Sequence, residues 1–313
     1  MYPVISIAEG SKSGSSARGE GLFAGAGRLA AVTVVAILAA VGAFLVVRSV
    51  PALVAGPAQA SLLDGNFVSY VLPLLFGTVW AAIWALVLAV PVAIGVALYL
   101  THYAPPRLRA GLGYLVDLLA AIPSVVFGLW GITVLAPALQ PIYVWLNEHL
   151  GWIPLFSGTV SGTGRTILTA GVVLAVMILP IITALSREVF LQSSRSVEEA
   201  ALALGATRWE MIRLAVLPTS RPGMVSAAML GLGRALGETM AVAMVLSATG
   251  TMTLQLLTSQ NPSTIAANIA LSFPEAYGTN INVLIATGLV LFATTFLVNA
   301  AARKILSRSE RGK

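Results

Sequence analysis

Residues 196–218 read SVEEAALALGATRWEMIRLAVLP, a polar, amphipathic interruption between two apolar stretches of the chain. Ser196 and Glu199 have the spacing of a capping box, in which two side chains bond the free amides at the start of a helix. Good helix formers follow, and Gly205 is placed where a glycine ends a helix. The first half of the segment therefore predicts a short helix closed by a glycine corner.

The second half of the segment repeats this pattern. Thr207 and Glu210 form a second capping box, and the helix is expected to run to about Val216 and stop before Pro218. Each helix has one apolar face, made by Val197, Ala200, Ala201 and Leu204 in the first and by Trp209, Ile212 and Ala215 or Val216 in the second. Periodicity alone leaves open whether these faces pack on the chain's own helices or on another protein.

The composition places this segment in a membrane protein. Of 313 residues, 58% are hydrophobic and 10% charged, with a mean hydropathy of +0.91, whereas soluble domains average about 25% charged residues. The absence of cysteine excludes disulfides, thiolate metal sites and cysteine nucleophiles. The net charge of +6 does not indicate nucleic-acid binding, because most basic residues flank apolar stretches.

Apolar stretches long enough to span a bilayer, about 20 residues each, predict an all-α integral membrane protein with six transmembrane helices. We expect a disordered tail at 1–28, a first helix and outer loop at 29–64, a transmembrane domain at 65–305, and a short tail at 306–313. The expected spans are about 29–47, 71–100, 112–136, 166–186, 222–247 and 281–302.

The basic residues predict the orientation of the chain. Because cytoplasmic loops are enriched in Lys and Arg, both termini and the 196–218 segment are expected to be cytoplasmic. An alternative for the first span is a cleaved signal peptide, with Ala58-Gln59-Ala60 as the cleavage site, although the apolar run is longer than is usual for one. His102 and His149 lie near span ends without ligand-like neighbours and are interpreted as interfacial.

A charged pair lies within the fifth apolar stretch. Arg234 and Glu238 are four residues apart, which places them on one face of a helix. Charges within a span usually face a water-filled cavity or a partner, although an internal ion pair that orders the bundle is the alternative. Gly233 and Gly237 have the G-x-x-x-G spacing that lets another helix approach closely.

This pair suggests the passage of an oxyanion. The Arg234 guanidinium has a planar fork of donors that matches phosphate. A carboxylate at Glu238 accepts a hydrogen bond from a protonated oxyanion and repels one that is fully ionised. Phosphate near neutral pH retains a proton and sulfate does not, so the pair is expected to favour phosphate.

Two motifs carry a resemblance to a known family. Glu199-Ala200-Ala201, then Gly205, then Leu217-Pro218 resembles the EAA loop of ABC-importer permeases, except that Ala215 stands where the family has isoleucine. The stretch from Gly231 to Val242, GLGRALGETMAV, is similar to the signature of the C-type subunit of phosphate-specific importers. The resemblance covers about residues 65–305 and implies the type I ABC-importer permease fold.

The resemblance also implies how the chain works. Glu199, Ala200, Ala201, Gly205, Leu217 and Pro218 would couple the chain to separate ATPase subunits, and Arg234 and Glu238 would take part in phosphate passage. The chain has no G-x-x-x-x-G-K-[ST] phosphate loop, so we expect no enzyme activity, no catalytic residue, no metal and no cofactor here, with ATP and Mg²⁺ bound by the ATPases.

The partners implied are a related A-type permease in a heterodimer, two ATP-binding cassette subunits, an extracytoplasmic phosphate-binding protein and the lipid bilayer of a bacterial inner membrane. Whether the membrane partner is instead a second copy stays open. The alternative functions are a secondary transporter with Glu238 as proton relay, and a membrane scaffold that anchors partners through 196–218. A membrane enzyme is disfavoured, since no catalytic constellation of side chains is recognisable.

Overall fold

The computed structural model describes residues 15–63 and 65–311. Within this part of the chain the only β feature is an isolated bridge between Ala248 and Asn261, and nearly all else is helical. The chain divides into two units, Met1–Arg48 and Ser49–Lys313, which are described separately. The all-helical fold class expected from the sequence is confirmed.

Helix α1 (Ser15–Val54) makes up the described part of the first unit and extends into the second. Its apolar side chains, such as Val35 and Phe44, are exposed, as they are in a helix that faces lipid. The expectation of a disordered tail at 1–28 is wrong for residues 15–28, which are helical. Once an apolar span has nucleated a helix, each further residue adds one hydrogen bond and extends it easily. Residues 1–14 lie outside the described part.

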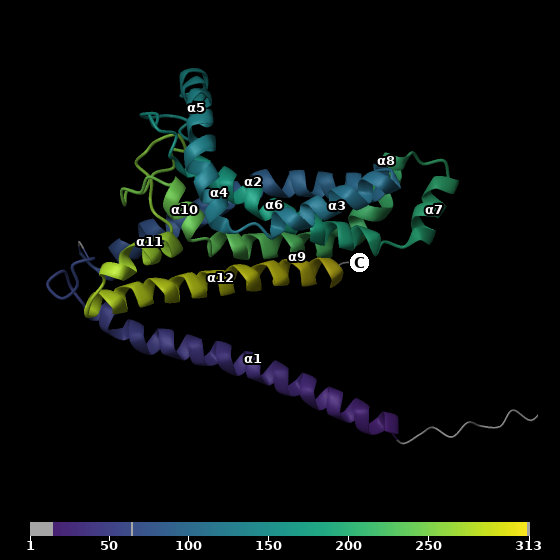
Figure 1. Ribbon diagram of the computed structural model, residues 1–313, viewed down its shortest axis with the longest axis horizontal. Coiled ribbons are helices and arrows are strands. Elements are labelled where there is room, and N and C mark those ends of the chain that lie inside the picture. Colours follow the sequence, from purple (N-terminus) through teal and green to yellow (C-terminus); the bar gives the residue numbers. More distant parts are fainter. Residues whose placement is uncertain (1–14, 64, 312–313) are drawn as a thin grey trace, which may run out of the picture. The chain divides into compact units, whose positions relative to one another are not determined.

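The second unit is built around two long helices, α2 (Phe67–Leu98) and α6 (Ile167–Leu191) (Figure 1). A row of fully buried alanines lines α2, and small residues let membrane helices approach closely. The row consists of Ala81, Ala82, Ala85, Ala89, Ala93 and Ala97. On α6, a Cβ at Gly171 would lie 3.0 Å from the Cβ of Trp84. Close packing between α2 and α6 is thus encoded by small side chains on both helices.

Helix α9 (Leu217–Leu236) packs on α6 and also contacts α2. A Cβ at Gly231 would lie 2.7 Å from Cδ1 of Ile182, and a Cβ at Gly223 would lie 2.5 Å from the side chain of Val189. These glycines therefore set the distance between the two helices.

The third expected span, 112–136, is wrong as a single helix. Helix α3 (Pro106–Ala120) ends before Pro123, because proline disfavours the α conformation in the residue before it. A longer helical run then follows and continues through residues expected to be an outer loop. It comprises α4 (Ser124–Trp130), the π-helix η2 (Gly131–Leu135) and α5 (Ala136–Leu150).

The fifth expected span, 222–247, is also interrupted. Helix α9 ends at Leu236, Gly237 is its C-cap, and the chain resumes as α10 (Met240–Val245). Five helices of the described chain are long and apolar enough to cross a membrane, and the broken α9–α10 segment takes the place of the sixth. The five are Phe23–Val54, Phe67–Tyr103, Ser124–Leu150, Ile167–Leu191 and Thr279–Lys304.

The loop between α10 and α11 (Ile265–Ser272) is more than a connector. Asn261 is fully buried; its Nδ2 donates to the carbonyl of Thr258 at 2.8 Å, and its Oδ1 accepts from the amide of Ile167 at 3.3 Å. One side chain thus fixes the loop to the start of α6. The chain then passes through the 3₁₀-helix η4 (Phe273–Glu275) into α12 (Thr279–Arg311).

Candidate functional site

The 196–218 segment begins with helix α7 (Arg195–Ala203). Its N-cap is Ser194, in an extended conformation, so the capping box predicted for Ser196 and Glu199 is wrong. Ser196 lies inside the first turn, where its hydroxyl is 2.7 Å from that of Ser194. Serine is equally favoured as N-cap at either position, so the sequence alone does not show which of the two serines precedes the first residue of the helix.

The glycine corner after α7 is confirmed. Gly205 has φ +87°, a backbone conformation that residues other than glycine rarely adopt. The amide of Gly205 donates to the carbonyl of Leu202 at 3.0 Å, and that of Ala206 donates to the carbonyl of Ala201 at 3.2 Å. This pair of bonds is a Schellman motif, which satisfies the last carbonyls of a helix. The direction in which the chain leaves α7 is thereby set.

The second capping box is confirmed at the start of α8 (Arg208–Met211). The amide of Thr207 donates to Oε2 of Glu210 at 2.8 Å, and the amide of Glu210 donates to Oγ1 of Thr207 at 3.3 Å. The bond from the Thr207 backbone amide, and secondarily that from its hydroxyl, lowers the pKa of the Glu210 carboxyl group from its ordinary value. The lowering follows because both bonds favour the ionised carboxylate.

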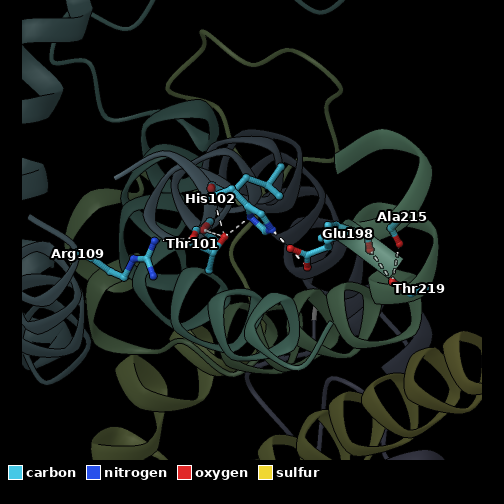
Figure 2. Close-up of polar contacts among 9 residues, drawn as sticks. Thr101, His102, Arg109, Glu198, Ala215 and Thr219 are labelled. Carbon is cyan, nitrogen blue, oxygen red and sulfur yellow. Dashed lines mark hydrogen bonds and ion pairs between the residues drawn. The ribbon is translucent and has the colours of Figure 1, made fainter. Parts of the chain in front are cut away.

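The expected stop before Pro218 is wrong. Helix α8 continues as the π-helix η3 (Ile212–Val216) directly into α9, with Pro218 in the first turn of α9. Inside a helix, proline removes one hydrogen bond to the preceding turn, and the π-helical turn η3 lies directly before Pro218. The hydroxyl of Thr219 donates to the carbonyls of Ala215 at 2.8 Å and Val216 at 3.0 Å (Figure 2). The segment from α8 to α9 is therefore one continuous helical rod.

The rod is anchored to the ends of α2 and α6. Phe190 and Ile212 are buried together with Ala97, Met211 and Val216. Ile212, Ala215 and Val216 thus form the buried face expected from the sequence, but Trp209 is 56% exposed and does not join it. Leu217 and Ala201 pack against the edge of this cluster.

Helix α7 is exposed. None of its residues is buried, and Leu204 at its end is 90% exposed, with Val197 and Leu202 also exposed. Glu199 and Ala200 lie on the same open helix. Exposed apolar residues can form a surface for a partner, whereas Ala201 packs against the chain's own cluster. Helix α7 thus contacts its own bundle along one edge and leaves most of its residues open.

One polar contact connects α7 to the end of α2. Nε2 of His102, on the π-helix η1 (Tyr99–Tyr103) that extends α2, lies 3.9 Å from Oε1 of Glu198 (Figure 2). Nδ1 of His102 is 2.7 Å from Oγ1 of Thr101, and Arg109 donates to the Thr101 carbonyl at 2.8 Å. Interpreting His102 as merely interfacial missed this contact, because nothing in its local sequence points to a residue of a distant helix.

Arg234 and Glu238 are not on one continuous helix. Helix α9 ends between them, and the carboxylate of Glu238 accepts a hydrogen bond from the amide of Ala241 at 3.1 Å, at the start of α10. Glu238 is 9% exposed. Arg234 is half-buried and makes no ion pair with Glu238 in the described chain. The alternative of a closed internal ion pair is therefore not what the structure contains.

The G-x-x-x-G pair is open within this chain. A Cβ at Gly233 would meet no atom within 4 Å, and one at Gly237 would meet only the backbone of α9, at 3.6 Å. The glycine that approaches another helix is Gly231, which packs on Ile182 of α6. Gly233 and Gly237 thus make no close helix contact inside the described chain, and their packing on a helix of another subunit stays a prediction.

Comparison with known proteins adds to this geometry. The model of the family described as "Binding-protein-dependent transport system inner membrane component" matches residues 89–311. The "Phosphate transport system permease protein PstC 2" of Mycobacterium tuberculosis is 50% identical over 308 residues, covering 94% of each chain. The PstC permease of Mycobacterium leprae is 48% identical over 84% of this chain and 85% of its own.

A solved structure shares the fold. An inward-facing structure of the MetNI methionine ABC transporter covers 76% of this chain and 94% of its own, with a TM-score of 0.50 and 20% sequence identity. The helical arrangement described above is thus that of a type I ABC-importer permease.

Proposed function

Because the chain belongs to the family of binding-protein-dependent transport system inner membrane components, we propose that it forms half of the translocation pathway of an ATP-driven phosphate importer. The observation that carries this proposal is the continuous rod from η3 into α9, which joins the exposed coupling segment to the helix that bears Arg234. The relatives are phosphate transport permeases, and this similarity supports phosphate as the substrate.

In this proposal α7 transmits the movement of a separate ATPase subunit. Its exposed apolar residues would enter a cleft of that subunit, with Glu199 and Ala200 at the contact, Ala201 packed against the membrane helices and Gly205 holding the corner. A displacement of α7 would pass through the Gly205 corner to α8 and then reach α9 through η3, because the rod from α8 to α9 is unbroken. ATP and Mg²⁺ would be bound and used by the ATPase pair, not by this chain.

The passage of phosphate would use Arg234 and Glu238 without an ion pair between them. An arginine that has no carboxylate partner keeps its donors available for an oxyanion. Glu238 is held by the amide of Ala241 through Oε1, which leaves its other oxygen to accept the proton of a protonated oxyanion. This arrangement supports binding of phosphate over sulfate, and the remaining ligands would come from the partner subunit.

The open face around Gly233 supports a membrane partner. A helix of a related A-type permease could approach α9 there, since no atom of this chain lies within 4 Å of a Cβ at Gly233. We further propose a bacterial inner-membrane location with both termini cytoplasmic. An extracytoplasmic phosphate-binding protein would deliver the substrate to the opposite side.

The test is uptake of labelled phosphate into cells whose only high-affinity route contains this chain. Arg234→Ala and Glu199→Ala are each expected to abolish uptake while the protein still inserts and assembles. Normal uptake by Arg234→Ala would remove the passage role. Uptake that collapses with a proton uncoupler but survives loss of ATP would replace the proposal with a secondary transporter.

A further inference from the structure

Two arginines from different helices line one cavity at the end of α2. Arg109 comes from α3 and Arg187 from α6, and the cavity has a volume of about 290 Å³. None of the described residues that line it is acidic. The remaining lining residues are Leu100, Thr101, Pro106, Ala110 and Leu191.

Arg187 has no partner inside the described chain. Its Nε is buried without a hydrogen bond, and its guanidinium makes no ion pair. Nη1 of Arg187 lies directly over Gly113 of α3, where a Cβ would collide with it. A buried donor without an acceptor is costly. The close fit over a glycine holds the guanidinium in place, with donors available for an acceptor from outside the chain.

Arg109 lies one turn before Gly113 on α3 and so faces the same side of the helix. Only its bond to the carbonyl of Thr101, at 2.8 Å, is recorded, which leaves further donors of its fork available. The acidic residues on the same two helices do not neutralise the pair: neither Asp117 nor Glu188 lies within 4.0 Å of an arginine nitrogen in the described chain.

A second, adjoining cavity extends the site toward the coupling helix. It has a volume of about 210 Å³ and shares Thr101, Arg109 and Leu191 with the first. His102, Arg195 and Glu198 also line it, and Arg195 and Glu198 belong to α7. An anion held by Arg109 therefore lies beside the contact that fixes α7 to the end of α2.

We propose that Arg109 and Arg187 bind a phosphate-bearing anion at the end of the membrane domain that carries α7. Arginine forks match phosphate oxygens in pairs, and basic pockets between membrane helices bind anionic headgroups. The phosphoryl group belongs either to an anionic phospholipid or to free inorganic phosphate. The cytoplasmic location of this end of the membrane domain rests on the proposed function. The positions of the two arginines and the cavity do not depend on it.

The experiment uses the full-length chain, with the subunits that copurify with it, in phosphatidylcholine nanodiscs. The melting temperature is measured before and after inclusion of phosphatidylglycerol, and separately before and after addition of inorganic phosphate. Arg187→Gln removes the side chain that is proposed to bind the anion, and it breaks no hydrogen bond or ion pair of the described chain. Arg107→Gln is the matched control, an exposed arginine on the same helix α3 that lines neither cavity.

We expect the wild type and Arg107→Gln to be stabilised by one of the two probes, and Arg187→Gln to need at least about tenfold more of it. A response to phosphatidylglycerol alone identifies a lipid, and a response to inorganic phosphate alone identifies the free anion. A phosphate response that persists in Arg234→Ala belongs to this cavity and not to the translocation pathway. Equal responses in Arg187→Gln and wild type would overturn the proposal, as would the absence of any response in wild type.

Discussion

Nε2 of His102 lies 3.9 Å from Oε1 of Glu198, and this polar contact joins the coupling helix α7 to the end of α2. The histidine side chain is 9% exposed and the glutamate side chain 20%. His102 also lies edge-on to Phe190 of α6, with ring centroids 6.4 Å apart. The contact therefore joins α7 to both long central helices.

We predict that loss of this contact impairs coupling more than stability. A partly exposed pair contributes about 1 kcal/mol or less, so Glu198→Gln and His102→Gln are expected to unfold at nearly the wild-type temperature. Phosphate uptake should fall several-fold, because α7 loses its fixed orientation. A double-mutant cycle on uptake checks this. Additive losses in the double variant would show that the two residues do not act through each other.

Gly205→Ala is predicted to distort the corner after α7. At φ +87° a Cβ costs about 1–2 kcal/mol, which the short exposed helix α7 cannot offset. Uptake and the association with ATPase subunits should both decrease, and Gly205→Asn should recover part of each because asparagine tolerates this conformation. Gly111→Ala is the control, since it lies on helix α3 with no atom within 4 Å of the added Cβ. Normal assembly of Gly205→Ala would contradict this role of the corner.

Glu238→Gln is predicted to weaken discrimination between phosphate and sulfate. Glutamine keeps an oxygen for the amide of Ala241, so the start of α10 should remain intact. It lacks the charge that repels a fully ionised anion. We expect phosphate uptake to fall and sulfate to compete at least about tenfold better, as for the loss of one charge-assisted bond. Competition uptake assays with both anions measure this, and unchanged selectivity would remove Glu238 from the passage.

Sequence reasoning succeeded where structure is decided locally. The Thr207–Glu210 capping box and the Gly205 corner were predicted because the groups that bond each other lie within five residues. The expectation that Ser196 caps α7 failed, because the helix begins two residues earlier, after Ser194, whose side chain makes no capping hydrogen bond. Local patterns thus identify a helix end to within a residue or two.

The remaining errors have a different physical origin. Hydropathy averages over about 20 residues, so it did not register the breaks at Pro123 and Gly237, each of which depends on a single residue. The contact of His102 with Glu198 joins residues from distant parts of the chain, and the Arg109–Arg187 cavity does the same. Such contacts depend on how helices pack, which a single sequence does not reveal.

The capping box at α8 predicts a pH dependence. The pKa of the Glu210 carboxyl group is lowered in the folded state from 4.5. The contribution of its ionised form to the stability of α8 is therefore fully present above pH 4.5, and it is lost as the pH falls through the lowered folded-state pKa. The protection factors of the amides of residues 208–211, which compare each exchange rate with that of an unstructured peptide at the same pH, should therefore fall at acidic pH. Glu210→Gln should remove this fall, because its amide side chain does not titrate there. Identical pH profiles for both proteins would assign the effect to another group.

Gly231→Ala and Gly233→Ala are predicted to act on different interfaces of α9. At Gly231 the added methyl group would lie 2.7 Å from Ile182, and overpacking of this kind costs about 1–3 kcal/mol, so the melting temperature of the isolated chain should fall. At Gly233 the methyl group meets no atom of the chain within 4 Å. There the isolated chain should keep or slightly gain stability, since alanine favours a helix over glycine.

The same pair of variants tests the membrane partner. If another subunit packs closely on the open face of α9, Gly233→Ala should reduce copurification of that subunit while the chain alone stays stable. Gly231→Ala should thus lower the melting temperature of the chain. Gly233→Ala should instead lower the recovery of the complex while the chain alone stays stable. Full recovery of the complex with Gly233→Ala would place the partner interface elsewhere, because a closely packed helix cannot accept the methyl group without a shift.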